Sequence, residues 1–362
     1  MSRKLEIGSN FWLTAEEMNN LHPLAERVYG LNQWEQCVMT SSGRGAIKLL
    51  FSQLPHVKKV LLPIYTCSSV INPIESLGKE CHFYPITRQL EVDADHLKTM
   101  VASLRPDAIY FQSYYGFDTL ASIQPYYHEF QQQGIAIVED ITHSWLCDFN
   151  TTAADYSVIS LRKWLQLPDG GALLSSKHPI KADQLSGESS TIVEEFAKAS
   201  ERKERYFKTL DPDDKQIFRQ HYIKAKDLLQ EDDAPHQLSA VSLSVLATTD
   251  FDAIVRKRRE NAIYLQDHLR SQCVDCFAPS LDEKATPLYF PVYVKDDRAK
   301  LQNELASHNI YCPIHWPMPK QVEPYVDVVS TYIYSHVLSL ICDQRYDTDD
   351  MAAMLEIINQ YC

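Results

Sequence analysis

The sequence lacks long apolar runs and an excess of basic residues, and we expect no export signal. No apolar segment is long enough to cross a bilayer, and the opening "MSRKLEIGSNFW" has neither the apolar stretch nor the cleavage site of a signal peptide. Lysine and arginine total 35 against 48 aspartates and glutamates, which gives a formal net charge of −13. Nucleic-acid binding needs clustered cations, so this balance argues against a nucleic-acid partner. We expect a cytoplasmic protein without a membrane partner.

The nine cysteines are an odd number, scattered along the chain without an export signal. This usage is typical of reduced thiols in the cytoplasm. Cys273 and Cys276, together with Cys312 and His315, imitate a Cys₃His zinc site. The first pair is expected on a strand, where residues three apart face opposite sides. We therefore favour buried apolar thiols over a metal site, and expect no metal.

Apolar runs alternate with segments of helical length from about residue 36 to 176. "KKVLLPIYT", "ECHFYPI", "DAIYFQSYYG", "GIAIVEDITH", "YSVISLRK" and "GALLSS" are typical of buried strands. Strands that alternate with helices predict an α/β fold, with a mostly parallel sheet and helices on both faces. The connection within "SLRKWLQLPDGGALLS" is too short for a crossover helix, so one antiparallel pair is expected there.

The second half of the chain has a different character. Residues 177–234 are charged and helical in period, like an insertion, and a long helix follows them. The remainder combines short strands with two helices, which predicts a small C-terminal α+β domain. We expect a large domain over residues 1–235, including the charged segment, and the long helix with the small domain over residues 236–362.

Ligands gather at the carboxyl ends of strands in doubly wound sheets, and three predicted strand ends carry polar groups. "TSSGRGAI" places Gly43 and Gly45 at a helix start, where free N–H groups favour an anion. The segment lacks the G-K-[ST] of a P-loop and the G-x-G-x-x-G of a dinucleotide fold. By itself it is more often an ordinary turn.

The other two strand ends carry charged groups. "AIVEDITHS" ends a strand on Asp140, with His143 three residues later. A carboxylate closing a buried strand needs a partner, although capping the next helix explains it equally well, and a lone histidine is usually structural. Lys163 ends its strand beside Ser160. Most lysines are solvated surface groups, so this position alone indicates little.

The combination is more informative than any single group. A lysine that forms a Schiff base needs a mostly buried site, which lowers its pKa. An aldehyde cofactor with a pyridine ring needs a carboxylate at its ring nitrogen and a helix N-terminus for its phosphate. Lys163, Asp140 and the segment from Gly43 to Gly45 meet these three demands, in the order in which one common fold presents them.

The first 176 residues resemble the DegT/StrS-type sugar aminotransferases, which are pyridoxal-phosphate (PLP) enzymes of fold type I. "SSGRGAIKLLF", "VLLPIYTCSSVINPI", "VEDITHS" and "LRKWLQLPDGGAL" resemble successive family motifs. "FDAIVRKRRENAIYL", "IYCPIHWP" and "LSLICDQRYDTDDM" resemble later segments, and the match is loose between residues 177 and 234. The resemblance implies a seven-stranded type of mostly parallel sheet, a PLP cofactor and a homodimer with its site at the interface.

Carried over by position, the family roles fall on the residues already described. Lys163 would form the Schiff base and move the proton between carbon atoms. Asp140 would bind the pyridine nitrogen, and His143 would contact the ring or its phenolic oxygen. The phosphate would be held by Ser160 and by the backbone of Gly43, Arg44 and Gly45, while His315 and Trp316 fall where relatives line the substrate pocket.

The chain departs from the family pattern at five positions. The family's threonine is Arg44 here, and a usual serine is Val158. The aromatic residue that often stacks on the ring is Cys67, so Tyr65 or another group must cover that face. The N-x-R that in many relatives reaches the phosphate of the neighbouring subunit aligns with Pro235 to Gln237.

The resemblance implies transfer of an amino group, from glutamate, to a keto sugar in nucleotide-linked form, in the building of cell-surface polysaccharide. Related sugar dehydratases carry histidine where this chain has Lys163, which favours transamination. Two other functions stay open, namely a PLP enzyme of the same fold with another carbonyl or amine substrate, and a degenerate binding protein. Ser160 to Lys163 also matches the S-x-x-K of penicillin-binding enzymes, but the chain lacks their K-T-G.

Overall fold

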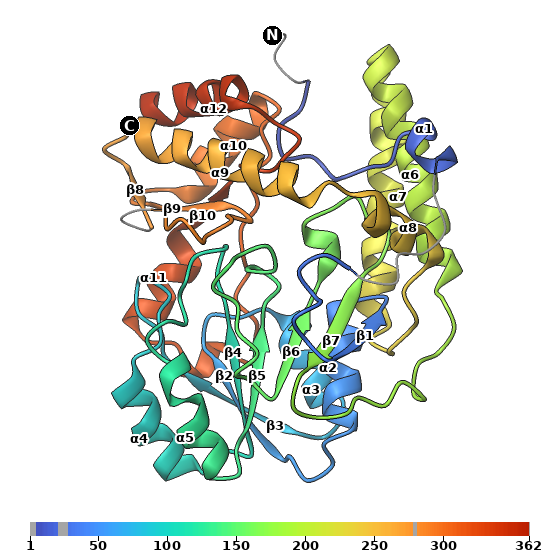
Figure 1. The fold of residues 1–362 in the computed structure, drawn as a ribbon. Coiled ribbons are helices and arrows are strands. Elements are labelled where there is room, and N and C mark those ends of the chain that lie inside the picture. The colour runs from blue at the N-terminus through green and yellow to red at the C-terminus, as the bar shows by residue number, and fades with distance from the viewer. Residues whose placement is uncertain (1–4, 21–27, 278–280, 362) are drawn as a thin grey trace.

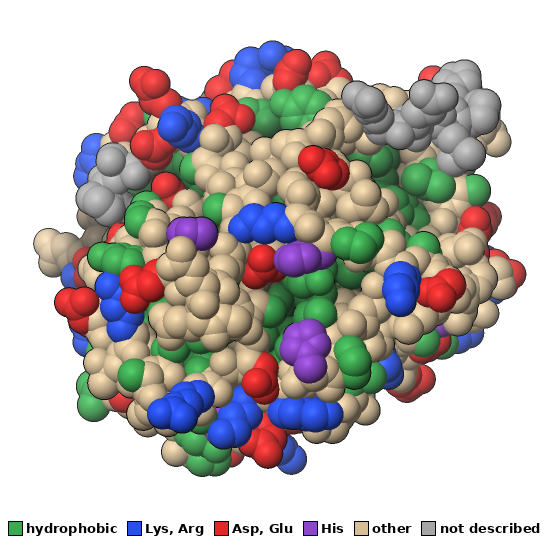
Figure 2. Space-filling model, turned by 60° about the horizontal axis from the view of Figure 1, so that its bottom comes forward, with side chains coloured by type: hydrophobic (Ala, Val, Ile, Leu, Met, Phe, Trp, Pro, Cys, Tyr) green, Lys and Arg blue, Asp and Glu red, His purple; other side chains and the backbone are tan. Residues whose placement is uncertain are grey.

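The computed structural model describes residues 5–20, 28–277 and 281–361. Figure 1 shows a large α/β domain, a small domain above it and a helical hairpin, α6 and α7, beside the sheet. Within the described ranges, no helix combines the length and the apolar character needed to span a bilayer. On the face shown in Figure 2, lysine and arginine side chains lie among aspartates and glutamates.

The large domain is built on a seven-stranded sheet in the order β1-β7-β6-β5-β4-β2-β3. Strand β7 runs antiparallel to both of its neighbours, and the other strands run parallel to one another. The sheet and its single antiparallel strand confirm the predicted α/β class and the antiparallel pair around residue 165. The strands are β1 (Gln36–Thr40), β2 (Lys59–Pro63), β3 (Glu80–Tyr84), β4 (Ala108–Gln112), β5 (Ala136–Asp140), β6 (Tyr156–Ile159) and β7 (Gly171–Ser175).

Helices cover both faces of this sheet (Figure 1). Right-handed crossovers place α2 and α3 on one face while the chain moves outward to β3. They place α4 and α5 on the other face when the chain returns toward β6. The helices are α2 (Gly43–Ser52), α3 (Ser68–Glu75), α4 (Ala94–Leu104) and α5 (Tyr127–Gln132), and the short α1 (Ala15–Asn19) precedes the sheet.

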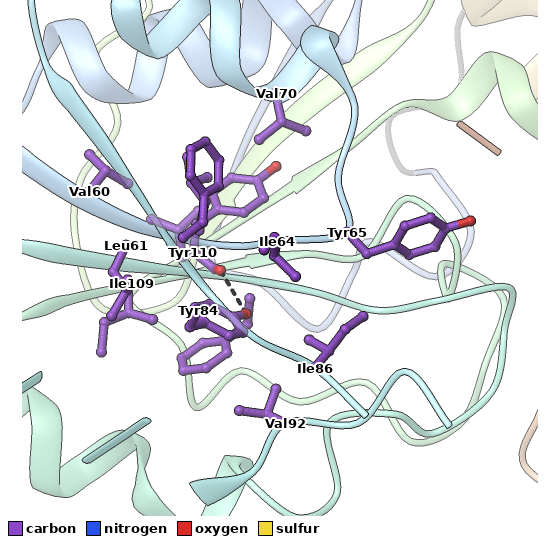
Figure 3. Packing of buried hydrophobic residues seen from close by; sticks show 14 of the residues in the cluster. Val60, Leu61, Ile64, Tyr65, Val70, Tyr84, Ile86, Val92, Ile109 and Tyr110 are labelled. Atoms are coloured by element: carbon purple, nitrogen blue, oxygen red, sulfur yellow. Dashed lines mark hydrogen bonds between the residues drawn. The ribbon is translucent and has the colours of Figure 1, made fainter. Parts of the chain in front are cut away.

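Apolar side chains of neighbouring strands form the main core. Val60 and Leu61 of β2 pair in register with Ala108 and Ile109 of β4, and all four are fully buried. Figure 3 shows these strands from close by, with the hydroxyl of Tyr84 donating to the carbonyl of a β4 residue over 3.1 Å. Because these strands are buried on both faces, their sequences are continuous apolar runs.

The charged segment forms a helical hairpin of α6 (Ser190–Thr209) and α7 (Pro212–Glu231). Asp211 caps α7, and Pro212 occupies its first helical position. A backbone N–H at this position would have no partner within the helix, so proline, which lacks that N–H, is well tolerated there. One face of each helix is apolar and buried, so the remaining faces carry the charges. The prediction of a helical segment within residues 177–234 is confirmed.

The second half of the chain differs from the expectation in two ways. The predicted long helix is two helices, α8 (Ala240–Thr248) and α9 (Phe251–His268), because Asp250 caps a new helix. The start of α9 packs in the core of the large domain, whereas Ala262 and Leu265 pack in the core of the small domain. The change from one core to the other therefore falls within α9 and not at residue 235.

The small domain pairs three antiparallel strands with helices, which agrees with the predicted α+β character. Its sheet has the order β10-β9-β8. Helices α9, α10 and α12 lie above this sheet in Figure 1, and α11 lies toward the large domain. The elements are β8 (Val274–Cys276), β9 (Phe290–Val294), α10 (Arg298–Ser307), α11 (Val328–His336), β10 (Val337–Leu340) and α12 (Thr348–Gln360).

Candidate active site

A cavity of about 190 Å³ lies at the carboxyl ends of β5 and β6, beside the N-terminus of α2. Parallel strands end at the same edge of a sheet, so groups far apart in the sequence meet there. The cavity brings together most of the residues predicted from the sequence. Its walls include Gly43, Arg44, Cys67, Asp140, His143, Val158, Ser160, Lys163 and Trp316.

Lys163 ends a single turn of 3₁₀ helix, Leu161–Lys163, that follows β6. Its Nζ lies 3.3 Å from Nε2 of His143 and 5.6 Å from the ring centre of Trp316. Burial lowers the pKa of the Lys163 amine, and the positive charge of Arg162 lowers it further. A larger fraction of this amine is therefore uncharged near neutral pH than for a surface lysine.

His143 is buried and its two ring nitrogens have different partners. Nδ1 accepts a hydrogen bond of 3.1 Å from the backbone N–H of Tyr115, which can only donate. The neutral ring therefore carries its hydrogen on Nε2, the atom that faces Lys163. Burial lowers the pKa of His143 well below its ordinary value, and the charge of Lys163 adds to this effect. The ring is thus a neutral donor toward the lysine amine.

Asp140 ends β5 with its carboxylate buried. One oxygen accepts the hydroxyl of Tyr110 over 2.8 Å, and the other accepts the backbone N–H of Thr142 over 2.9 Å. Both donors are neutral, and within the described part of the chain no ion pair involves this carboxylate. Asp140 therefore holds a negative charge on the cavity wall that a cationic group of a ligand can pair with.

The N-terminus of α2 approaches the cavity closely because glycines surround it. Ser42 caps the helix and accepts the N–H of Gly45 over 3.0 Å. A methyl group on Gly43 would lie 3.1 Å from Cβ of Ser160, and one on Gly171 would lie 2.4 Å from the backbone of Ser42. Gly171 therefore has no room for a side chain and Gly43 has little, so the backbone of the first turn of α2 lies close to the neighbouring loop and strand.

Arg44 borders the cavity and also contacts the helical hairpin. Its guanidinium donates to the carbonyl of Leu229, at the end of α7, over 3.0 Å. Lys48, one turn further along α2, forms an ion pair with Asp233. The departure from the family's threonine thus ties α2 to the helical hairpin, and burial lowers the pKa of Arg44.

Three predicted residues, Gly45, Tyr65 and His315, lie outside the cavity wall. Tyr65 is fully buried, and Figure 3 shows its ring pointing away from the packed side chains of β2 and β4. Its hydroxyl bonds the hydroxyl of Tyr115 over 3.0 Å. His315 bonds Ser339 over 2.9 Å, and burial lowers its pKa to about 3. Neither side chain borders the cavity, whereas Trp316 does.

The segment Pro235–Gln237 packs against its own chain. The carbonyl of His236 accepts the N–H of Ser41 over 2.8 Å, next to the start of α2. A methyl group on Gly45 would lie 3.2 Å from Cα of Pro235. In this chain the segment therefore supports the α2 N-terminus from behind.

Among the described residues, the cysteines gather in no cluster that could hold a metal ion. No group of three or more potential metal ligands occurs among the residues the structure describes. Cys273 is disulfide-bonded, so it offers no thiolate to a metal. This bond also departs from the expectation that the thiols are reduced. The free cysteines of the described ranges are Cys37, Cys67, Cys81, Cys147, Cys276, Cys312 and Cys342.

Several wall residues are absent from the sequence-based set. Thr142 accepts the N–H of Ser160 over 3.0 Å and so joins the loops after β5 and β6. Gln112 ends β4 and faces the cavity, and its strand-end position is a signal that the sequence offers. Arg162 precedes the lysine directly. Lys226 and Gln230 come from α7, and no motif near them indicates this position.

No protein-family profile matches this chain, and no curated protein matches it. Solved structures do share its fold. PseC of Helicobacter pylori, an aminotransferase of pseudoaminic acid biosynthesis, superposes with a TM-score of 0.69 at 11% identity, over 98% of both chains. DesV of S. venezuelae, solved with a ketimine intermediate, gives 0.67 at 14% identity, over 96% of this chain and 92% of DesV.

A DegT/DnrJ/EryC1/StrS aminotransferase from Brucella abortus gives a TM-score of 0.65 at 15% identity, over 91% of this chain and 86% of the other. These identities are low, so the likeness concerns the fold. The expectation of fold type I is confirmed. The protein thus has the fold of the sugar aminotransferases that its motifs resemble.

Proposed function

We propose that the protein is a PLP-dependent aminotransferase that passes an amino group from glutamate to the keto carbon of a nucleotide-linked sugar. The observation that carries the proposal is the meeting of Lys163 and Asp140 on the walls of one cavity beside the N-terminus of α2. The shared fold and the ketimine bound in DesV support it.

The residues of the cavity fit the cofactor. The first turn of α2 offers the backbone N–H groups of Gly43 and Arg44 to its phosphate, with Ser160 close by, while the N–H of Gly45 is donated to Ser42. Asp140 takes part in no ion pair among the described residues and offers its carboxylate to the pyridine nitrogen. Trp316 provides an apolar surface on the wall. When bound, PLP supplies an electron sink for the bond that breaks at the amino-bearing carbon.

Lys163 acts as the acid and base of both half-reactions. Its lowered pKa leaves Nζ able to accept a proton near neutral pH and to return it to a neighbouring carbon. His143 directs its Nε2–H at this amine and so holds it in place.

Cofactor capture tests the first part of the proposal. We expect the purified protein to bind PLP with a visible absorption that borohydride bleaches, and peptide mass spectrometry to find the reduced label on Lys163. Lys163→Ala loses the label, whereas Lys257→Ala, on the exposed face of α9, keeps it. A protein that takes no PLP onto Lys163 contradicts the proposal and favours a binding protein.

The amino donor is tested separately. Glutamate is expected to convert the bound cofactor to its pyridoxamine form and to release 2-oxoglutarate. Subsequent addition of nucleotide-linked keto sugars is expected to restore the first spectrum and to yield an amino sugar. If PLP labels Lys163 but no amino donor changes the spectrum of the bound cofactor, the protein uses PLP for a reaction other than transamination.

The proposal includes two features that the resemblance implies. The first is a homodimer with its site at the interface, which analytical ultracentrifugation of the purified protein tests. The second is a place in the cytoplasm, in the building of cell-surface polysaccharide. Cell fractionation tests the location, and loss of the amino sugar from the polysaccharide of a deletion strain tests the process.

A further inference from the structure

A second cavity of about 700 Å³ adjoins the one that contains Lys163. The two share three wall residues, Arg162, Lys163 and Lys226, so a molecule in the larger cavity reaches the lysine amine. The larger cavity lies between α7, the segment Gly8–Phe11 and the small domain. Its position makes it the entry for a substrate larger than the smaller cavity holds.

Three cations on its wall lie outside the ion pairs of the described residues, although the charge of Asp169 acts on Arg162 at longer range. Arg162, Arg219 and Lys226 border this cavity, and within the described ranges no ion pair involves any of them. Other cations of α7 are paired, since Lys215 binds Glu6 and Lys224 binds Glu195. Unpaired cations that converge on one cavity favour an anionic ligand.

Beside these three cations and Lys163, the charged groups on the wall of the cavity are Arg345 and Asp343, which neutralise each other. Arg345 pairs with Asp343 through two hydrogen bonds of 2.8 and 2.7 Å, and it also donates to the carbonyl of Ser9. Arg162 is partly buried, and burial together with the charge of Arg44 lowers its pKa to about 10. The net positive charge of the cavity therefore comes from Arg162 and the two cations of α7.

Helix geometry places the α7 cations together. Arg219 and Lys226 are seven residues apart, two helical turns, so they lie on one face with Ile223 between them. Both side chains are exposed, and the exposed Ile223 also borders the cavity. This face of α7 thus combines two charges with an apolar contact, in reach of Arg162.

We propose that Arg162, Arg219 and Lys226 form an oxyanion subsite, which holds the phosphate or carboxylate group of a substrate while its reacting carbon lies at Lys163. This assignment rests on the proposed function, and it places the recognition of the anion on the helical hairpin of the same chain. Arginine and lysine side chains bind phosphate and carboxylate groups alike, so a substrate with either group fits the same subsite.

Isothermal titration of the PLP-treated protein tests the subsite, with pyrophosphate and 2-oxoglutarate as probes. The double variant Arg219→Gln/Lys226→Gln changes exposed residues and is expected to keep the unfolding temperature. We expect it to weaken the binding of one probe roughly tenfold or more, since each cation makes a charge-assisted contact. The probe whose binding weakens shows whether the subsite holds a phosphate or a carboxylate group. In the wild type, the affinity for this probe is expected to fall with added salt.

Lys224→Gln is the matched control, because it removes one charge from another face of the same helix. It is expected to bind both probes as the wild type does. Equal affinities of wild type and double variant overturn the proposal, and so does a wild type that binds neither probe. If PLP fails to label Lys163 while pyrophosphate binding still depends on Arg219 and Lys226, the proposed function fails and the subsite stands.

Discussion

Nε2 of His143 lies 3.3 Å from Nζ of Lys163 and directs its hydrogen at that amine. The backbone N–H of Tyr115 determines this orientation, because it occupies the other ring nitrogen. A donor that faces an amine stabilises the uncharged form of the amine. Burial acts in the same direction on the pKa of Lys163. The two residues therefore form a unit in which a histidine helps to keep a lysine uncharged.

His143→Ala is expected to raise the pKa of Lys163 toward its ordinary value, because water enters the space of the ring and the donor is lost. Competitive acetylation of the PLP-free protein, followed by peptide mass spectrometry across pH, measures this pKa. We expect the labelling rate of Lys163 at pH 7 to fall, because a smaller fraction of the amine is then uncharged. His178→Ala, at the Asp155 pair, is the control. An unchanged rate in His143→Ala contradicts the role.

Tyr110→Phe is expected to destabilise the fold more than Tyr84→Phe does. Both hydroxyls are buried, but Tyr110 donates to the carboxylate of Asp140, whereas Tyr84 donates to a backbone carbonyl. Hydrogen bonds to charged groups contribute more, so we expect losses of about 2 and about 1 kcal/mol in the free energy of unfolding. Urea denaturation measures both, and equal losses would show that Asp140 does not depend on Tyr110.

Gly171→Ala is expected to displace the start of α2. The new methyl group would lie 2.4 Å from the backbone of Ser42 and 2.6 Å from the N–H nitrogen of Gly43. We expect a loss of about 3 kcal/mol in stability and weaker PLP binding, measured by thermal unfolding and by spectroscopic titration. Gly187→Ala meets no atom within 4 Å and serves as control. Unchanged PLP binding in Gly171→Ala would show that the phosphate does not lie at the N-terminus of α2.

Glu139→Gln is expected to stabilise the protein above neutral pH. Burial raises the pKa of Glu139 from 4.5 to about 7, and its carboxylate accepts the hydroxyl of Tyr127. The folded state binds more protons than the unfolded state between these values, so stability falls as the pH rises from 4.5 through 7. Glutamine keeps an acceptor without the charge.

We therefore expect Glu139→Gln to be more stable than wild type by about 3 kcal/mol at pH 8, and equally stable below pH 4.5. Denaturant unfolding at a series of pH values measures the difference. Glu129→Gln, an exposed position on α5, is the control and is expected to change little. A difference that does not vary with pH would show that Glu139 is charged throughout this range.

The sequence by itself determined the sheet, the order of its strand ends and the groups that meet at them. Alternating strands and helices can form a parallel sheet in few ways, since crossovers are right-handed and carboxyl ends share one edge. Because Asp140 and Lys163 each follow an apolar run, the two residues could be predicted to border the same cavity. The glycines before β7 and at α2 were also readable, because close backbone approach excludes other residues.

Only the tertiary structure decided what surrounds these groups. Arg44 bonds the end of α7 across 185 residues of sequence, and no local pattern predicts that contact. Tyr65 turns toward Tyr115 and leaves the cavity wall to Trp316. The same packing brings Lys226 to the cavity. Side-chain direction and helix docking depend on how all elements fill the space between them, which a one-dimensional pattern does not contain.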